Sequence, residues 1–238
     1  MPHLSIVIPA YNEEKKIHRD IEAVYDYLKE YSIDGELIIV NDGSKDKTYE
    51  IASEYSKKYP SLKALTYEHN KGKGYAVKTG VLNANGDYIL IADSGICVPY
   101  KCTNDGLKLL QEGNDIAIGS RRIADIKRKI ITKQPLYRRL GSKVFHFLIK
   151  IFNLIPPGVD DTQCGFKLFK KEVAHNIFKN MFTEKFMWDI EMLRRAQKGK
   201  YKVIPFGVEW SNDPDTRYNP LIGSLENMVQ ILSIMIRT

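Results

Sequence analysis

Acidic and turn-forming residues end the first two apolar runs of the chain. The run from Val7 leads into Pro-Ala-Tyr-Asn-Glu-Glu, and the run from Ile38 leads into Asn-Asp-Gly-Ser-Lys-Asp. Each pattern predicts a strand whose carboxyl end opens into a polar turn. In open α/β sheets, ligands bind in the crevice beside such strand ends. Acceptors for base N–H groups and ribose hydroxyls would stand together there, which suits a nucleotide.

A glycine-rich basic turn follows the third predicted strand. It runs from His69 to Gly74, reads His-Asn-Lys-Gly-Lys-Gly, and opens a predicted helix. Backbone N–H groups at a helix start favour phosphate, and so do ammonium groups. We expect Lys73 to approach the nucleotide more closely than Lys71 does. The alternative is a plain loop with solvated lysines.

Further charged residues follow predicted element ends. Arg121 comes after a predicted strand and can pair bidentately with phosphate. Asp161, Asp189 and Glu191 are acidic candidates in the second half of the chain. Residues two apart do not share a helix face, so only one of Asp189 and Glu191 is expected to point into a site. The alternative for these acids is a helix N-terminus, where the dipole stabilises negative charge.

The order of the elements predicts the fold that positions these residues. Strands are predicted at 4–9, 36–40, 62–67, 88–92, 115–119 and 201–208, and helices at 14–31, 46–59, 74–84, 105–112, 171–180 and 221–236. Strands that alternate with helices imply a parallel sheet with right-handed crossovers. We therefore expect one α/β domain over residues 1–238, with a mostly parallel, Rossmann-like sheet flanked by helices. Residues 161–169 receive no predicted element.

Positive charge is concentrated in one segment. The chain of 238 residues has a net charge of +7, and Gly119–Lys150 contains ten Lys or Arg residues but one acid, Asp125. Hydrophobic residues recur there at helical spacing, so the segment could lie on an anionic membrane surface or be a core helix with a solvated basic face. No motif for binding nucleic acid accompanies the charge. The tail 221–236 has Leu221, Leu225, Met228, Leu232 and Met235 on one face, and is too short and polar to span a bilayer.

The cysteines and the start of the chain bear on location. Cys97, Cys102 and Cys164 have neither metal-ligand spacing nor an even disulfide framework, which indicates a reducing compartment. The first 14 residues lack a basic n-region and a cleavage site, so no signal peptide is expected. We expect a cytoplasmic protein, peripheral on the cytosolic face of a membrane if the basic segment binds lipid.

Seven motifs, in order and spacing, resemble the family 2 glycosyltransferases, and in particular their polyprenyl-phosphate branch of dolichyl-phosphate glucosyl- and mannosyltransferases. The motifs are VIPAYNEE, IIVNDGSKDKT, HNKGKGYAVKTG, GDYILIAD, GSRR, DTQCGFKLF and WDIEML. The resemblance covers nearly the whole chain. It implies a GT-A-type domain with a nucleotide-sugar half at 1–120, an acceptor half at 121–220 and an amphipathic helix at 221–238.

The resemblance also implies roles for individual residues. Donor-binding residues would be Pro9, Ala10, Tyr11, Glu13, Val40, Asp42, Lys73, Asp93, Ser94 and Arg217. Catalytic candidates would be Asp189, Asp161 and Arg121. With a hydroxyl acceptor, Asp189 would be the general base. With a phosphate acceptor, which is already an anion, Asp189 would orient the acceptor or steady positive charge at the anomeric carbon.

The chain departs from the family at its usual metal motif. The family has Asp-x-Asp, whose two carboxylates let Mg²⁺ or Mn²⁺ bridge to the diphosphate, whereas this chain has Asp93-Ser94-Gly95. Three explanations follow. A metal could bind through Asp93, phosphate oxygens and waters; basic residues such as Arg121, Arg217 or Lys73 could replace it; or the chain could be a weak or inactive relative.

The function expected from the sequence is inverting transfer of a hexose from a UDP-glucose or GDP-mannose type donor to a polyprenyl phosphate. The alternatives are the same chemistry on a glycan hydroxyl and a non-catalytic nucleotide-sugar-binding protein. The nucleotide, the sugar and the oligomeric state are left open by the sequence.

Overall fold

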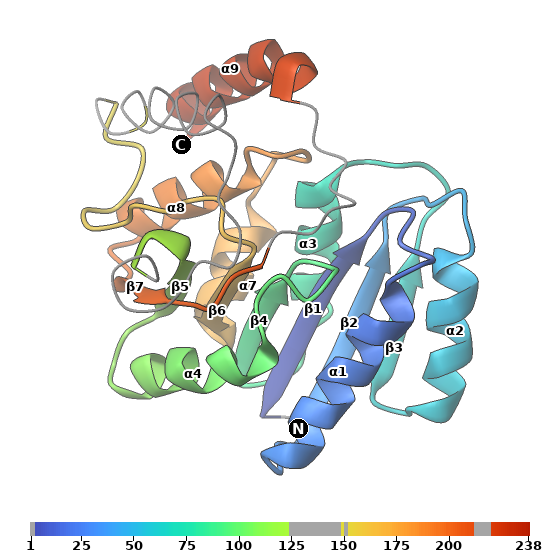
Figure 1. Ribbon diagram of the computed structural model, residues 1–238. Coiled ribbons are helices and arrows are strands. Elements are labelled where there is room, and N and C mark those ends of the chain that lie inside the picture. Colours follow the sequence, from blue (N-terminus) through green and yellow to red (C-terminus); the bar gives the residue numbers. More distant parts are fainter. Residues whose placement is uncertain (1–2, 124–148, 150–151, 212–219) are drawn as a thin grey trace.

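A seven-stranded sheet forms the centre of the molecule (Figure 1). The computed structural model describes residues 3–123, 149, 152–211 and 220–238. The strands are β1 (Leu4–Ala10), β2 (Gly35–Asn41), β3 (Leu62–Thr66), β4 (Tyr88–Ala92), β5 (Ile116–Ser120), β6 (Phe166–Lys170) and β7 (Val203–Gly207). Their order across the sheet is β3-β2-β1-β4-β6-β5-β7.

The sheet is mostly parallel, as predicted. β1 pairs in parallel with β2 and β4, β2 with β3, and β5 with β7. The exception is β6, which runs antiparallel between β4 and β5. Residues 166–169 of β6 lie in the segment 161–169, for which the sequence predicted no element, because Lys167 interrupts the apolar run there.

Helices cover both faces of the sheet. They are α1 (Ile17–Glu30), α2 (Thr48–Lys58), α3 (Lys73–Leu82), α4 (Thr103–Gln111), α7 (Lys171–Lys179), α8 (Trp188–Lys198) and α9 (Pro220–Arg237), with a short 3₁₀ turn at Tyr100–Cys102. α1, α2 and α4 pack on one face, where one hydrophobic cluster lies. α3, α7 and α8 pack on the other face with the second cluster. The predicted single α/β domain is therefore confirmed.

The last helix, α9, is apolar on two opposite sides. Ile234 is fully buried and Met235 packs against the core formed with α8. Val229, Leu232 and Ile236 are exposed, by 58%, 53% and 84%. Leu232 and Met235, which the sequence placed on one apolar face, differ in burial: Leu232 is exposed, whereas Met235 packs against the core.

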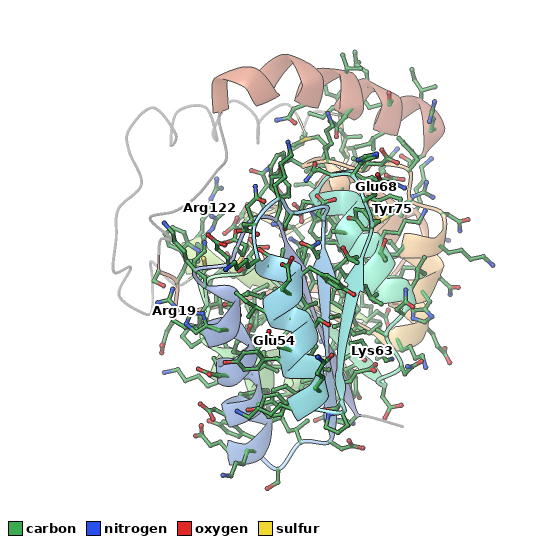
Figure 2. All side chains as sticks on the ribbon, turned by 90° about the vertical axis from the view of Figure 1, so that its right-hand side faces the viewer. Arg19, Glu54, Lys63, Glu68, Tyr75 and Arg122 are labelled. Carbon is green, nitrogen blue, oxygen red and sulfur yellow. The ribbon has the colours of Figure 1, made fainter. Side chains whose placement is uncertain are left out.

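The carboxyl ends of the parallel strands lie at one edge of the sheet. In Figure 2, Lys63 marks the start of β3, whereas Glu68 follows its carboxyl end and lies at the same end of the sheet as Tyr75 of α3.

Most of the basic segment Gly119–Lys150 and the predicted donor ligand Arg217 are outside the described residues. Within the described part of the chain, no helix is long and apolar enough to cross a membrane.

Candidate active site

The carboxylate of Asp42 organises the glycine-rich turn. Asp42 follows β2 and is buried. Its Oδ1 accepts hydrogen bonds from the Tyr67 hydroxyl at 2.6 Å and the Lys71 N–H at 2.9 Å. Its Oδ2 accepts from the Asn70 side-chain amide at 2.8 Å and the Gly72 N–H at 3.0 Å. Asp42, predicted as a nucleotide ligand, therefore also fixes the shape of the neighbouring turn.

Two glycines of this turn are required by close contact with the chain before α8. Gly72 has φ +103°, and a Cβ there would lie 2.7 Å from the Glu184 carbonyl oxygen. A Cβ on Gly74 would lie 2.5 Å from the Thr183 carbonyl oxygen. The Tyr75 N–H donates to the Glu184 oxygen at 2.9 Å. The turn thus packs against the segment before α8 at the sheet edge.

The loops that follow β1 and β2 are interlocked. The Asn12 N–H donates to Ser44 Oγ at 2.8 Å, and the Glu13 N–H donates to Thr48 Oγ1 at 2.7 Å. These bonds hold together the strand ends that carry the predicted nucleotide contacts, which are Pro9, Ala10, Tyr11, Glu13 and Val40. The Val40 side chain is fully buried, so only its backbone can reach a ligand.

Asp93, at the end of β4, lies among three cations. Lys73 Nζ is 2.6 Å from Asp93 Oδ1, and this pair is partly exposed. Burial alone would raise the pKa of Asp93, but the charges of Lys73, Lys167 and Arg121 hold that pKa below its ordinary value. The three cations come from α3, β6 and the end of β5. The structure therefore brings together Lys73, Asp93 and Arg121, which the sequence singled out separately.

Arg121 and Asp161 form a bidentate ion pair. Arg121 Nε donates to Asp161 Oδ2 and Nη2 to Oδ1, each at 2.7 Å, and the Arg121 N–H also reaches Oδ2 at 3.0 Å. Burial opposes ionisation of Asp161, yet Arg121 holds the pKa of this carboxyl below its usual range. The guanidinium lies 5.5 Å from the ring centre of Trp210. Arg121 is thus fixed on both sides at the sheet edge.

Lys167 is a buried partner of Asp189 that the sequence did not place in the site. Its side chain is fully buried, and Nζ donates to Asp189 Oδ1 at 2.5 Å and to the Cys164 carbonyl at 2.6 Å. Burial raises the pKa of Asp189 above its ordinary value, although Lys167 and Lys73 act to lower it. Asp189 is therefore held in place by a dedicated cation.

Asp189 and Glu191 diverge, as their spacing predicted. Glu191 is fully buried and accepts hydrogen bonds from the Thr183 N–H at 2.7 Å and from Arg195 Nε at 2.8 Å. It therefore supports the segment before α8, whereas Asp189 faces Lys167.

Asp20, a residue of α1, holds the loop that follows Asp93. Its carboxylate is fully buried and accepts hydrogen bonds from Ser94 Oγ at 2.6 Å and from the Gly95 N–H at 2.9 Å. Burial raises the pKa of Asp20 to about 6. The Ser94 hydroxyl, predicted to bind the donor, is used in this internal bond. Sequence reasoning missed Asp20, because 75 residues separate it from Gly95.

Asp20→Asn is expected to change how stability depends on pH. The Asp20 carboxyl has an ordinary pKa of 3.8 and a folded-state pKa of about 6. Between these values the folded state holds the extra proton, so this carboxyl makes the protein less stable as pH rises. Asparagine keeps an acceptor for the Gly95 N–H but does not ionise. From pH 4 to pH 7, the variant should gain up to about 3 kcal/mol of unfolding free energy relative to wild type.

Urea unfolding at several pH values tests this expectation. Asp26→Asn is the control, because Asp26 is exposed on the same helix. Parallel pH profiles for Asp20→Asn and wild type would contradict it.

The donor set at Asp93 does not match a protein-held divalent ion. Mg²⁺ and Mn²⁺ prefer several oxygen ligands. Asp93 is ion-paired with Lys73, and Gly95 supplies no side chain where a second carboxylate would stand. Among the described residues, no three His, Cys, Asp or Glu side chains are grouped so that they could hold a metal.

Comparisons with known proteins agree with the geometry of the site. The model of the family "Glycosyl transferase family 2" matches residues 5–178. A human dolichyl-phosphate beta-glucosyltransferase is 33% identical over 98% of this chain and 75% of its own length.

Two solved structures share the fold. One is a mannosyltransferase from Pyrobaculum calidifontis in complex with GDP-Man and Mn²⁺, with a TM-score of 0.68 and 18% identity; the match covers 100% of this chain and 65% of that one. The other is glucosyl-3-phosphoglycerate synthase from Mycobacterium tuberculosis with Mn²⁺ and UDP-glucose, with a TM-score of 0.65 and 19% identity over 98% and 79% of the two chains.

The family match covers most of the chain, and the human relative matches almost all of it. The loops after β1 and β2, the glycine-rich turn and the paired acids lie at one edge of a sheet whose fold is that of GT-A glycosyltransferases. This chain therefore belongs to glycosyl transferase family 2 and is a glycosyltransferase.

Proposed function

We propose that this protein transfers glucose, with inversion, from a UDP-glucose type donor to a polyprenyl phosphate. The observation that carries the proposal is the match to a dolichyl-phosphate beta-glucosyltransferase along nearly the whole chain, both halves of the domain included. GDP-mannose is the second donor to be tested, because the Pyrobaculum structure, which shares this fold, contains GDP-Man.

In this proposal the amino-terminal half binds the donor. The ends of β1 and β2 contact the base and ribose through Pro9, Ala10, Tyr11, Glu13, Val40 and Asp42. Asp93 and Lys73, at the start of α3, face the diphosphate, and we assign Ser94 and Arg217 to the same side, although the Ser94 hydroxyl also bonds Asp20 and Arg217 lies outside the described residues. Because Asp42 bonds the backbone of Lys71 and Gly72, it also sets the position of the turn that precedes Lys73.

The acceptor phosphate attacks the anomeric carbon from the face opposite the leaving diphosphate. A phosphate monoester is an anion at neutral pH, so no residue has to remove a proton from it. A phosphate acceptor has no proton for Asp189 to remove, and Asp189 is paired with the buried Lys167, so we assign Asp189 the orientation of the acceptor rather than proton abstraction. Arg121, fixed by Asp161, contributes positive charge on that side.

We also propose peripheral contact with the cytosolic face of a membrane. A polyprenyl phosphate resides in a bilayer, so the active site must approach one. The exposed Val229, Leu232 and Ile236 of α9 form an apolar stripe opposite the buried Ile234. Burying such a stripe in the interface while basic residues meet anionic lipid is a known mode of peripheral binding.

A transfer assay tests the proposed function. Purified full-length protein is incubated with UDP-[¹⁴C]glucose or GDP-[¹⁴C]mannose and with dolichyl or undecaprenyl phosphate in detergent. Label should pass into the organic phase only when the polyprenyl phosphate is present, and more from UDP-glucose than from GDP-mannose. Absence of transfer from both donors to both lipids would reject the proposal.

A further inference from the structure

The loop after β4 offers a single carboxylate to the donor. Asp93 is partly exposed, whereas the position two residues later is Gly95, which has φ +97° and no side chain. A second carboxylate, that of Asp20, contacts this loop, but it is fully buried and accepts hydrogen bonds from Ser94 and Gly95. Asp20 therefore anchors the loop from the interior and is not presented toward a ligand in the crevice.

The remaining carboxylate already has a cation beside it. Lys73 Nζ lies 2.6 Å from Asp93 Oδ1, a carboxylate oxygen that a metal ion bridging Asp93 to a diphosphate would need as a ligand. Asp93 also experiences the charges of Lys167 and Arg121. A divalent ion at Asp93 would have to displace one cation and remain close to two others, which Coulomb repulsion opposes.

Lys73 is placed to contact both Asp93 and a bound diphosphate. It is the first residue of α3, directly after Gly72, so its ammonium and the N-terminal N–H groups of the helix lie at the same end. About a quarter of its side chain is exposed. An ammonium has three donor hydrogens, so a bond to Asp93 leaves others for phosphate oxygens.

We propose that the ammonium of Lys73, held by Asp93, supplies the positive charge at the donor diphosphate, and that donor binding and transfer by this chain need no divalent metal. The inference deepens the proposed function and rests on it. It also distinguishes this chain from the Pyrobaculum mannosyltransferase, whose structure contains Mn²⁺ with GDP-Man. For this chain the inference follows from Gly95 and from the ion pair on Asp93.

Calorimetric titration of the full chain with UDP and with GDP tests the proposal without requiring turnover. Each titration is done in 1 mM EDTA and in 1 mM MnCl₂. For the nucleotide that binds, the dissociation constants in the two buffers should agree within fivefold. Lys73→Met should weaken binding in EDTA by roughly tenfold or more, since it removes a charged phosphate contact. A fivefold or greater gain from Mn²⁺ in the wild type, or a Lys73→Met protein that binds like wild type in EDTA, would overturn the inference.

Lys63→Met is the matched control. Lys63 also pairs with a carboxylate, at 2.7 Å from Glu36 Oε2, but it lies at the other end of the sheet (Figure 2). Removing its charge should leave nucleotide affinity within twofold of wild type. If neither nucleotide binds in either buffer, the proposed function fails, and this inference, which rests on it, fails as well. If binding is metal-independent but no sugar is transferred, the proposed transfer fails, while the role of Lys73 in nucleotide binding stands.

Discussion

Lys167→Met is expected to lower the free energy of unfolding by roughly 3–5 kcal/mol, the usual cost of removing one partner from a buried ion pair. Lys167 is fully buried and only 8% of the Asp189 side chain is exposed, so water cannot replace the lost cation. Methionine fills a similar volume but leaves the Asp189 carboxyl without its partner. Chemical denaturation followed by circular dichroism measures the loss.

The loss should increase with pH. Burial already raises the pKa of Asp189 in the wild type, and without Lys167 that pKa rises further. At low pH the Asp189 carboxyl is protonated in both the folded and the unfolded variant, so it lowers the free energy of unfolding little. As pH increases, the unfolded chain loses the proton first, and the folded state is penalised. The deficit should therefore be larger at pH 8 than at pH 5.

Two further variants separate stability from function. Lys170→Met breaks a pair on the same strand that is partly exposed, 3.2 Å from Asp115, and should cost less than about 1 kcal/mol. In the double variant Lys167→Met/Asp189→Leu, both charges are replaced by apolar groups, so most of the stability should return. Transfer should not return, because Asp189 is gone. Equal losses of unfolding free energy for the Lys167 and Lys170 variants would contradict the expectation that the buried pair contributes more to stability than the partly exposed one.

The sequence predicted the elements of the amino-terminal half because each has a clear local signal. β1, β2 and β4 are continuous apolar runs, and their turns carry Gly, Asn and Asp. The segment containing β6 was missed because a lysine in its centre reads as polar. Alternation along β6 did hold a clue: Lys167 shares a sheet face with the buried Phe169, and an ionisable residue at a buried position needs a partner.

The connections within the site could not be predicted from local patterns. Asp93 and Asp189 were chosen as site residues, but their cations Lys73 and Lys167 are 20 and 22 residues away along the chain. Asp20 reads as one more polar residue of an amphipathic helix, and its bond to Gly95 depends on how α1 packs against the end of β4. Such pairings follow from the order of strands in the sheet, which periodicity does not specify.

Gly165→Ala is expected to weaken donor binding strongly while the protein remains folded. A Cβ at this position would lie 2.0 Å from Asp93 Oδ2 and 2.3 Å from Oδ1, far inside contact distance. The backbone cannot easily retreat, because the Asp93 N–H donates to the Gly165 carbonyl at 3.0 Å. The Asp93 carboxylate must therefore turn away, and its ion pair with Lys73 breaks. A displacement of this size at a phosphate-binding group should reduce transfer by about 100-fold.

Gly106→Ala separates this local effect from a general loss of stability. A Cβ on Gly106 would meet Leu168 Cδ1 at 2.6 Å, a similar overpacking of the core at a site away from Asp93. Each substitution should cost about 1–3 kcal/mol of unfolding free energy. Only Gly165→Ala should lose nucleotide affinity in calorimetric titration, because only there does the added methyl group meet the carboxylate that holds Lys73. A Gly165→Ala protein with wild-type affinity would mean that the position of Asp93 does not govern donor binding.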